Sequence, residues 1–188
     1  MSAYVFQTSR LIIRKASATD RDVDMYFGLW TDPKVMVYVG FPRGLSITRN
    51  QIYDRIEAED KSEYDSLLVI ALKDNDSPIG ECKLGYPDSD GISETDVKLL
   101  PQYWNNGYGK EVKKGLVDYL FENTNCIAVK ATPNKTNIAS QKMQAAVGGK
   151  KVAEAVYKFP SEMRKFTIDV PHYIYMVYRE DWLNSKRQ

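Results

Sequence analysis

The spacing of apolar residues changes several times along the chain, and each change marks a predicted element. Between residues 20 and 30 the apolar positions recur every three or four residues, which is the period of one face of a helix. These positions are Val23, Tyr26, Phe27 and Trp30. A second helix is expected after Thr48, because Thr48 and Gln51 have the spacing of a capping box.

From residue 67 onward the pattern becomes that of strands, with turn residues between the apolar runs. Strands are predicted at residues 11–16, 67–72, 78–85, 95–100 and 127–131, and a closing hairpin at residues 151–159 and 165–179. Two later helices are expected, one starting near Gly109 and one running from about residue 137 to Gly148. Because strands and helices do not alternate as regular βαβ units, the predicted fold class is α+β with a mixed sheet.

Residues 101–111 join a predicted strand to an amphipathic helix and contain two glycines, Gly107 and Gly109. Glycine permits positive φ and leaves no Cβ in front of the first helical turn, whose N–H groups have no partner within the helix. Together with the positive end of the helix dipole, these N–H groups suit an anion, and best a phosphate. An ordinary strand-to-helix turn is the alternative, because loops are rich in glycine in any protein.

Two common phosphate-binding patterns do not fit this segment. Val112 stands where a dinucleotide fingerprint would have its third glycine. In the ATP-type pattern, Trp104 takes the place of the first glycine and Glu111 follows the lysine. Neither pattern therefore identifies the phosphate.

Four motifs, which occur in the family's order and spacing, resemble the GNAT N-acetyltransferases and within them the branch that includes ribosomal-protein N-terminal acetyltransferases. Tyr103-Trp104 followed by Gly107-Tyr108-Gly109 resembles the acyl-CoA-binding signature, with tryptophan at the usual Gln or Arg position. The other three motifs are residues 8–14, residues 137–140 with Gly148, and residues 179–182. The resemblance covers nearly the whole chain.

The resemblance implies a single GNAT-like domain over residues 1–188, with a mixed and mostly antiparallel central sheet flanked by helices. A splayed cleft between two strands would hold acetyl-CoA as cosubstrate, with its pantetheine arm along a strand edge. The residues expected to bind it are Val97, Lys98 and Leu99 at that edge, Trp104, Asn105, Asn106, Gly107, Tyr108, Gly109 and Lys110 in the turn, and Asn137 and Ser140 in the following helix.

The same resemblance implies direct transfer of an acetyl group to a primary amine in a ternary complex. Asn137 would hold the CoA arm and Ser140 would approach the thioester sulfur, although both residue types also serve simply as helix caps. Glu94 is the candidate general base, with a solvated strand face as the alternative explanation for its carboxylate. The expected catalytic residues are therefore Ser140, Glu94 and Asn137. Gln144 stands where many members of the superfamily carry a tyrosine that protonates the leaving thiolate, and His172 is expected to be structural.

Composition narrows the choice of partners and compartment. The chain has 26 Lys and Arg against 25 Asp and Glu, a net charge of +1, so no strong field favours nucleic acid or an anionic membrane. The apolar runs are too short to span a bilayer, and residues 1–10 lack the apolar core of a signal peptide. Cys82 and Cys126 are expected to be buried, and one histidine with two distant cysteines predicts no metal site. A cytoplasmic protein is expected, and the resemblance adds a homodimer as a common assembly.

Two alternatives from other classes stay open at the level of the sequence. A non-catalytic CoA-binding or protein-interaction module with the same fold would explain Gln144 and the lack of a clear base. An unrelated phosphate-binding protein would explain the glycine-rich turn alone. The amine acceptor is equally open, since a ribosomal-protein N-terminus, another peptide, a polyamine and an antibiotic amine all fit.

Overall fold

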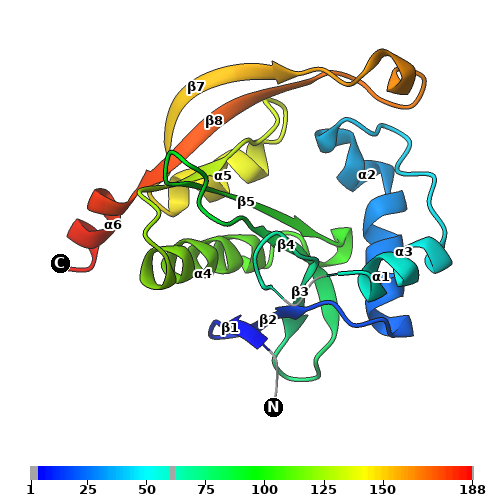
Figure 1. Cartoon of the computed structure of the whole chain (residues 1–188), viewed down its shortest axis with the longest axis horizontal. Helices are drawn as coiled ribbons and strands as arrows, with labels where there is room; N and C mark the ends of the chain where they lie inside the picture. The colour runs from blue at the N-terminus through cyan, green and yellow to red at the C-terminus, as the bar shows by residue number, and fades with distance from the viewer. Residues whose placement is uncertain (1–3, 60–61, 188) are drawn as a thin grey trace.

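The computed structural model describes residues 4–59 and 62–187, which form an eight-stranded sheet with helices on both faces (Figure 1). Residues 1–3, 60–61 and 188 of the expected domain lie outside these ranges. The strand order is β1-β2-β3-β4-β5-β6-β8-β7, and every neighbouring pair is antiparallel except β5 and β6. The strands are β1 (Tyr4–Gln7), β2 (Leu11–Lys15), β3 (Leu68–Leu72), β4 (Pro78–Leu84), β5 (Ile92–Leu99), β6 (Ala128–Ala131), β7 (Lys150–Tyr157) and β8 (Val170–Tyr178). The predicted α+β class with a mixed, mostly antiparallel sheet is confirmed.

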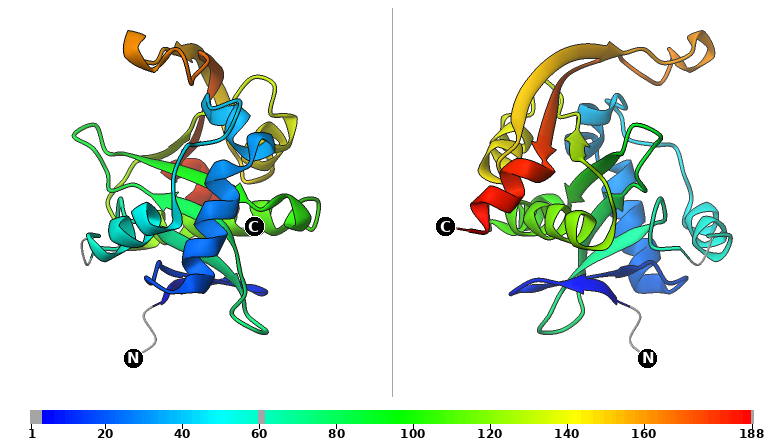
Figure 2. Two further views of the ribbon diagram at one scale, coloured as in Figure 1. Left: turned by 90° about the vertical axis from the view of Figure 1, so that its right-hand side faces the viewer. Right: turned by 60° about the vertical axis from the view of Figure 1, so that its left-hand side comes forward.

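Helices cover both faces of the sheet. Because side chains alternate along β3, this strand contributes buried residues to both faces. Leu68 and Ile70 belong to the buried cluster that α4 completes, whereas Val69 and Ala71 belong to the cluster of α1 and α3. The helices are α1 (Asp20–Thr31), α2 (Pro33–Met36), α3 (Arg49–Glu57), α4 (Tyr108–Asn123), α5 (Ile138–Ala146) and α6 (Arg179–Ser185), with 3₁₀ turns η1 (Val37–Val39), η2 (Pro101–Tyr103) and η3 (Ser161–Met163). Figure 2 shows α1 and α4 on opposite sides of the central strands.

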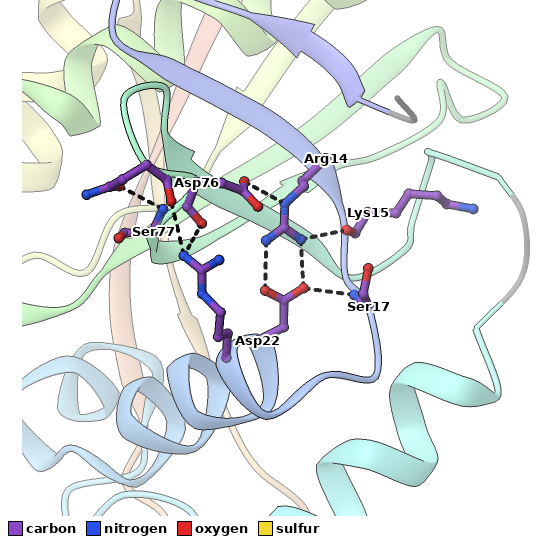
Figure 3. Close-up of polar contacts among 8 residues, drawn as sticks. Arg14, Lys15, Ser17, Asp22, Asp76 and Ser77 are labelled. Carbon is purple, nitrogen blue, oxygen red and sulfur yellow. Dashed lines mark hydrogen bonds and ion pairs between the residues drawn. The ribbon is translucent and has the colours of Figure 1, made fainter. Parts of the chain in front are cut away.

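A buried ion pair attaches α1 to the sheet. Arg14 of β2 donates two hydrogen bonds, of 2.7 and 2.8 Å, to the Asp22 carboxylate, and Asp22 is 1% exposed (Figure 3). The same carboxylate accepts the Ser17 N–H at 2.9 Å, and Arg14 Nε donates to Asp76 in the β3–β4 turn at 3.2 Å. The hydrogen bonds to Asp22 raise the pKa of Arg14, against the opposing effect of its burial. The first turn of α1 therefore contains a buried charge whose partner is supplied by the sheet.

The sheet opens where β5 leaves β6. Residues 92–94 of β5 pair with residues 128–130 of β6, whereas residues 95–99 of β5 pair with β4 on the other side. After β5 the chain passes through η2 into α4. The splayed cleft expected from the sequence therefore lies beside the second half of β5.

The β7–β8 hairpin arches away from the body of the sheet and reaches the segment that follows α2 (Figure 1). At its far end Ile168 donates its N–H to the Gly40 carbonyl at 2.9 Å. The Phe159 and Phe41 rings meet edge to face, with 5.3 Å between their centroids. The hairpin thus connects the last strands to the helical segment that lies on the opposite side of the cleft.

Most predicted elements are present, and the differences have simple causes. β1, α2 and α6 are four, four and seven residues long, which is too short for a periodic signal. The predicted second strand of the hairpin is wrong before Val170, because residues 165–169 lie in the connection. The capping box is confirmed by hydrogen bonds in both directions between Thr48 and Gln51. Both cysteines are buried, as expected.

Candidate active site

A cavity of about 480 Å³ occupies the open part of the sheet. One wall is β5 with the turn that starts α4, and a second wall is α5 with the segment before it. The third wall consists of Val35, Tyr38 and Val39, from α2 and η1. The cavity therefore joins the glycine-rich turn to the helical segment near the hairpin tip.

Backbone alternation along β5 decides which groups face this cavity. The Leu100 N–H donates to the Ile79 carbonyl of β4 at 2.9 Å. Since backbone groups of successive residues point to opposite sides of a strand, Lys98 also directs its backbone to β4. Val97 and Leu99 direct theirs toward the gap that β6 leaves. Two of the three expected edge residues thus present backbone groups to the cavity, and Lys98 presents its side chain.

Two groups of this edge already have partners within the chain. Trp104 Nε1 donates to the Leu99 carbonyl at 2.8 Å, and the Val97 N–H donates to the Asp96 carboxylate at 2.9 Å. The Leu99 N–H and the Val97 carbonyl are the donor and acceptor that remain for the amides of a pantetheine arm. Trp104 therefore braces the edge as well as lining the cavity.

The turn before α4 has the backbone geometry of an anion site. Asn105 and Gly107 both have positive φ, of 62° and 78°, and Gly107 is the N-cap of α4. Left-handed residues turn successive N–H groups to one side, and the first N–H groups of a helix have no partner within it. Gly109 has a different role, since a Cβ there would lie 3.2 Å from the Met143 sulfur of α5. Gly107 thus shapes the turn, and Gly109 allows α5 to approach it.

Asn137 and Ser140 begin α5, and both line the cavity. The Asn137 side-chain oxygen accepts the Ser140 N–H at 3.0 Å, so Asn137 caps the helix. Capping engages the oxygen of the amide and leaves its Nδ2 donor for a ligand. Gln144 is 4% exposed and lies outside the lining, whereas Tyr38 brings a phenol to the cavity from η1.

Asp96 brings a carboxylate to the lining, where it forms a chain of charges with Lys98 and Glu81. The Lys98 ammonium group contacts the Asp96 carboxylate and lies 3.0 Å from Glu81 Oε1. The partial burial of Asp96, whose side chain is 47% exposed, raises its pKa, but the charge and hydrogen bond of Lys98 and the Val97 N–H outweigh this effect and lower the pKa. Burial lowers the pKa of Lys98, yet Asp96 and Glu81 raise it overall. At neutral pH both members of the pair are therefore charged.

A buried lysine lies behind this part of β5. Lys113 of α4 is 1% exposed, and its ammonium group hydrogen-bonds Thr95 Oγ1. Burial lowers the pKa of Lys113 to about 7, against the opposing attraction of Asp96 and Glu94. Among the described residues, Ser93 Oγ is buried with no hydrogen-bond partner. Buried polar side chains therefore lie next to the point where β5 and β6 separate.

Three predicted site residues lie outside the lining. The Glu94 carboxylate lies 3.6 Å from Lys130 Nζ, in the part of the sheet that stays closed. The Asn106 carbonyl accepts a hydrogen bond from Arg10 Nη1 at 3.1 Å. The Tyr108 ring lies beneath the same guanidinium group, 4.5 Å from its carbon. Asn106 and Tyr108 therefore support the turn from the side that faces β2.

The other predicted residues do line the cavity, namely Val97, Lys98, Leu99, Trp104, Asn105, Gly107, Gly109, Lys110, Asn137 and Ser140. Four residues outside the expected set also line it, namely Asp96, Tyr38, Asn134 and Lys142. Asp96 and Glu94 lie on the same face of the strand, so the sequence pattern could not distinguish one carboxylate from the other. His172 lies outside the lining, with Nδ1 3.0 Å from the Val170 carbonyl.

These features fit the CoA cosubstrate that the sequence motifs imply. The β5 edge offers backbone groups to a pantetheine arm, and the left-handed turn with the start of α4 offers N–H groups to a pyrophosphate. Lys110 and Lys142 add positive charge to the same cavity.

Comparisons with known proteins agree with this assignment. A family model for the acetyltransferase (GNAT) domain matches residues 10–150. Similar solved structures include a GNAT-family acetyltransferase from Bacillus anthracis, with a TM-score of 0.74, 20% identity and coverage of 93% of this chain and 98% of that chain. Another is ribosomal-protein-S5-alanine acetyltransferase from Vibrio fischeri, with a TM-score of 0.73, 17% identity and coverage of 94% and 97%. Spermidine N-acetyltransferase from Vibrio cholerae, in complex with CoA and spermine, has a TM-score of 0.74, 14% identity and coverage of 93% and 99%.

The chain belongs to the GNAT acetyltransferase family, as the match over residues 10–150 shows. The Vibrio fischeri neighbour agrees with the ribosomal-protein acetyltransferase branch that the motifs indicate, although structures at such identities establish the fold alone. A sequence search of curated proteins finds no match. Within the described ranges, no group of three or more His, Cys, Asp or Glu residues is arranged to hold a metal ion. No helix in the described part of the chain is both long and apolar enough to cross a membrane.

Proposed function

We propose that this protein transfers an acetyl group from acetyl-CoA to a primary amine by direct attack in a ternary complex. The observation that carries the proposal is a single cavity that contains the left-handed turn before α4, the open edge of β5 and the Asp96 carboxylate. Cosubstrate and amine would then meet in one space, which is the main requirement for transfer without a covalent enzyme intermediate. Membership of the family supports acetyl-CoA as the donor.

Backbone groups carry most of the cosubstrate binding in this proposal. The Leu99 N–H and the Val97 carbonyl pair with the pantetheine amides, and the N–H groups at the start of α4 bind the pyrophosphate. Lys110 and Lys142 contribute charge near the phosphates. Asn137 offers its Nδ2 donor to the arm while its oxygen caps α5.

In the chemical step the amine nitrogen attacks the thioester carbonyl carbon, the C–S bond breaks, and the sulfur leaves as a thiolate. The ammonium form of the amine, with a pKa of ~8 for an α-amine or ~10 for a lysine-like amine, must first lose a proton. Asp96 orients this ammonium group and takes the proton, directly or through one water. The nitrogen loses its second proton as the amide forms, and this proton passes to the thiolate through the Ser140 hydroxyl or a water, which donates one proton and takes up the other. Little assistance is needed, because a thiol with a pKa of ~8.5 is a good leaving group.

The charges of the lining favour an acceptor with one ammonium group. Among the described residues of the lining, Asp96 is the single carboxylate, and Lys98 already shares it. Lys110 and Lys142 make the rest of the cavity positive. A polyamine or an aminoglycoside carries several positive charges, most of which would lack partners here. A peptide N-terminus or a small monoamine therefore fits better.

A non-catalytic CoA-binding module with the same fold is the second candidate. The observation that favours it is Gln144, which lies outside the lining at the position where many family members place a tyrosine. The two candidates differ in turnover rather than in binding. The experiment is to incubate the protein with acetyl-CoA and a panel of peptides, spermidine and an aminoglycoside, and to measure release of free CoA together with the mass of each product. An acetylated peptide supports the proposal. Binding of acetyl-CoA without release of free CoA in the presence of any of the amines supports the second candidate.

A further inference from the structure

One carboxylate links the β1–β2 turn to the first turn of α4, 101 residues away in the sequence. Glu111 accepts hydrogen bonds from the hydroxyl groups of Thr8 at 2.5 Å and Ser9 at 3.1 Å. It also accepts the Arg10 N–H at 2.9 Å and Arg10 Nε at 2.7 Å. Figure 1 shows β1 running beside α4, so this contact lies at the junction of two elements. We call these four residues the loop clamp: Thr8, Ser9, Arg10 and Glu111.

From Glu111 the side chain of Arg10 continues to the turn that precedes α4. Its Nη1 donates to the Asn106 carbonyl at 3.1 Å, and its guanidinium carbon lies 4.5 Å from the centre of the Tyr108 ring. Gly107, between these two residues, has a φ of 78° and would place a Cβ 3.5 Å from Arg10 Nη2. A single guanidinium group therefore borders three consecutive residues of the turn.

The loop clamp also determines the charge at this helix end. Glu111 lies in the first turn of α4, where a carboxylate interacts favourably with the helix dipole but would repel a phosphate. Burial raises the pKa of Glu111, and the hydrogen bonds from Thr8, Arg10 and Ser9 outweigh it and lower the pKa. The carboxylate is thus ionised at neutral pH, and Arg10 Nη2, 2.7 Å from Glu111 Oε2, supplies the compensating charge.

We propose that the loop clamp positions the turn for the phosphates of CoA: Arg10 holds residues 106–108, with Gly107 in its left-handed conformation, and neutralises Glu111 beside the anion. This inference rests on the proposed function, because it concerns the same cosubstrate. Arg10 and Glu111 are positioning residues, since neither lines the cavity. Their effect should therefore fall on the phosphate end of CoA and spare the pantetheine end.

Calorimetric titration with three probes tests this: CoA, its nucleotide half 3′-phospho-ADP, and its other half pantetheine. Arg10→Ala should weaken binding of CoA and of 3′-phospho-ADP by the same factor, about tenfold, because it removes charge-assisted hydrogen bonds and exposes Glu111. Pantetheine binding should change by less than about twofold, which is the effect expected of a distant change. Arg10→Lys should give an intermediate loss, because lysine keeps the charge without the fork of donors. Adding Glu111→Gln to Arg10→Ala should restore part of the affinity.

The control is Arg49→Ala, which removes a similar surface arginine. Arg49 Nε donates to Asp24 at 2.6 Å, and its guanidinium carbon lies 4.1 Å from the centre of the Phe27 ring, far from the turn. Unchanged CoA affinity in Arg10→Ala, or equal losses for pantetheine and 3′-phospho-ADP, would overturn the inference. So would an equal loss in the Arg49→Ala control. Wild-type protein that does not bind CoA would overturn the proposed function itself, which the first titration determines before any variant is compared.

Discussion

Asp96 is held between groups that favour its ionised form, and this limits the chemistry available to it. The Lys98 ammonium group and the Val97 N–H both stabilise the carboxylate, so its pKa is lowered. A carboxylate with a low pKa is a weak base, and its strongest effect is to bind an ammonium group and orient it. Because it stays ionised down to acidic pH, loss of activity on mild acidification would come from the protonation of the amine.

Replacing Asp96 with asparagine tests this role against the original candidate, Glu94. Asp96→Asn should lower kcat/KM for the amine by about 10²-fold, because it removes both the charge that orients the ammonium group and the acceptor of its proton, and leave the Kd for CoA unchanged. Glu94→Gln should change kcat/KM by less than about threefold, because Glu94 is paired with Lys130 outside the lining. Steady-state kinetics with one peptide acceptor measure both. A large loss in Glu94→Gln with a small one in Asp96→Asn would reverse the assignment.

Lys113 is a buried cation that weakens the fold at neutral pH. Its pKa in the folded state is about 7, well below the ~10.4 expected when unfolded. The unfolded state therefore binds more protons between pH 7 and pH 10, and stability should rise with pH across that window. Lys113→Met should remove this rise and stabilise the protein at pH 7 by on the order of 2–4 kcal/mol.

Urea unfolding of wild type and variant at pH 7 and pH 9 measures the effect. The matched control is Lys114→Met, since the Lys114 side chain is 62% exposed and pairs with Asp118 one helical turn away. That variant should shift stability by less than about 1 kcal/mol. A loss of stability in Lys113→Met would contradict the interpretation of Lys113 as a strained buried charge.

At the scale of elements, the segment formed by β2 and the turn before it contacts helices on both faces of the sheet through two arginines. Arg10 in the turn before β2 binds Glu111 of α4, and Arg14 within β2 binds Asp22 of α1. The two pairs differ in burial, because the Arg10 side chain is 48% exposed and Asp22 is 1% exposed. The exposed Arg10–Glu111 pair is therefore expected to affect mainly the turn before α4, and the buried Arg14–Asp22 pair to affect mainly the stability of the fold.

Asp22→Asn should lower the free energy of unfolding by about 3 kcal/mol. The substitution leaves Arg14 with its main partner neutral, and removing one member of a buried pair is strongly destabilising. Asp24→Asn, two residues along α1, is the control: Asp24 is 58% exposed in its pair with Arg49, so the change should be below about 1 kcal/mol. Urea denaturation gives the free energy of unfolding of both variants. Equal losses of stability would show that the burial of an ion pair does not determine how much its disruption destabilises the protein.

Asn137 combines a structural and a binding role in one side chain, and the two separate on substitution. Asn137→Asp keeps the oxygen that accepts the Ser140 N–H but removes the Nδ2 donor. It should therefore leave stability within about 0.5 kcal/mol and weaken CoA binding. Asn137→Ala should in addition lose about 1 kcal/mol of stability. Thermal unfolding and CoA titration of the two variants measure the two roles separately, and unchanged affinity in both would leave Asn137 as a cap only.

The sequence predicted elements whose signal is local. The capping box at Thr48 and the end of α5 near Gly148 depend on neighbours a few residues away, and both are found. The glycine-rich turn was predictable for the same reason. Residues 165–169 carry alternating apolar residues, but the Ile168 N–H bonds the Gly40 carbonyl, so a tertiary contact decides against a strand.

Most of the expected CoA-binding residues line the cavity, but the candidate carboxylate was predictable only as far as its strand face. Glu94 and Asp96 lie two residues apart on β5 and are equivalent by pattern. They differ because β6 pairs with β5 up to Glu94 and then departs, which leaves Asp96 in the open part. The register of a strand more than thirty residues later in the chain fixes that point. The Arg10–Glu111 contact, 101 residues apart in sequence, is likewise beyond local patterns.

At the scale of the whole molecule, the cavity draws its walls from three separate regions of the sequence. β5 with the turn before α4 forms one wall, α5 forms another, and α2 with η1 forms the third. The β7–β8 hairpin reaches this third wall through the bond between Ile168 and Gly40. A ligand in the cavity would therefore contact most of the fold at once, and its binding should stabilise the entire domain against unfolding.

Thermal unfolding with acetyl-CoA, CoA and ATP at equal concentrations tests the central claim most directly. A ligand at ~100 times its Kd that binds only the folded state adds about 2.7 kcal/mol, which corresponds to a rise of about 5–10 °C in Tm for a domain of this size. We predict that rise with both CoA species and less than about 1 °C with ATP. A rise with ATP alone, or no rise with either CoA species, would contradict the assignment of the cavity to CoA.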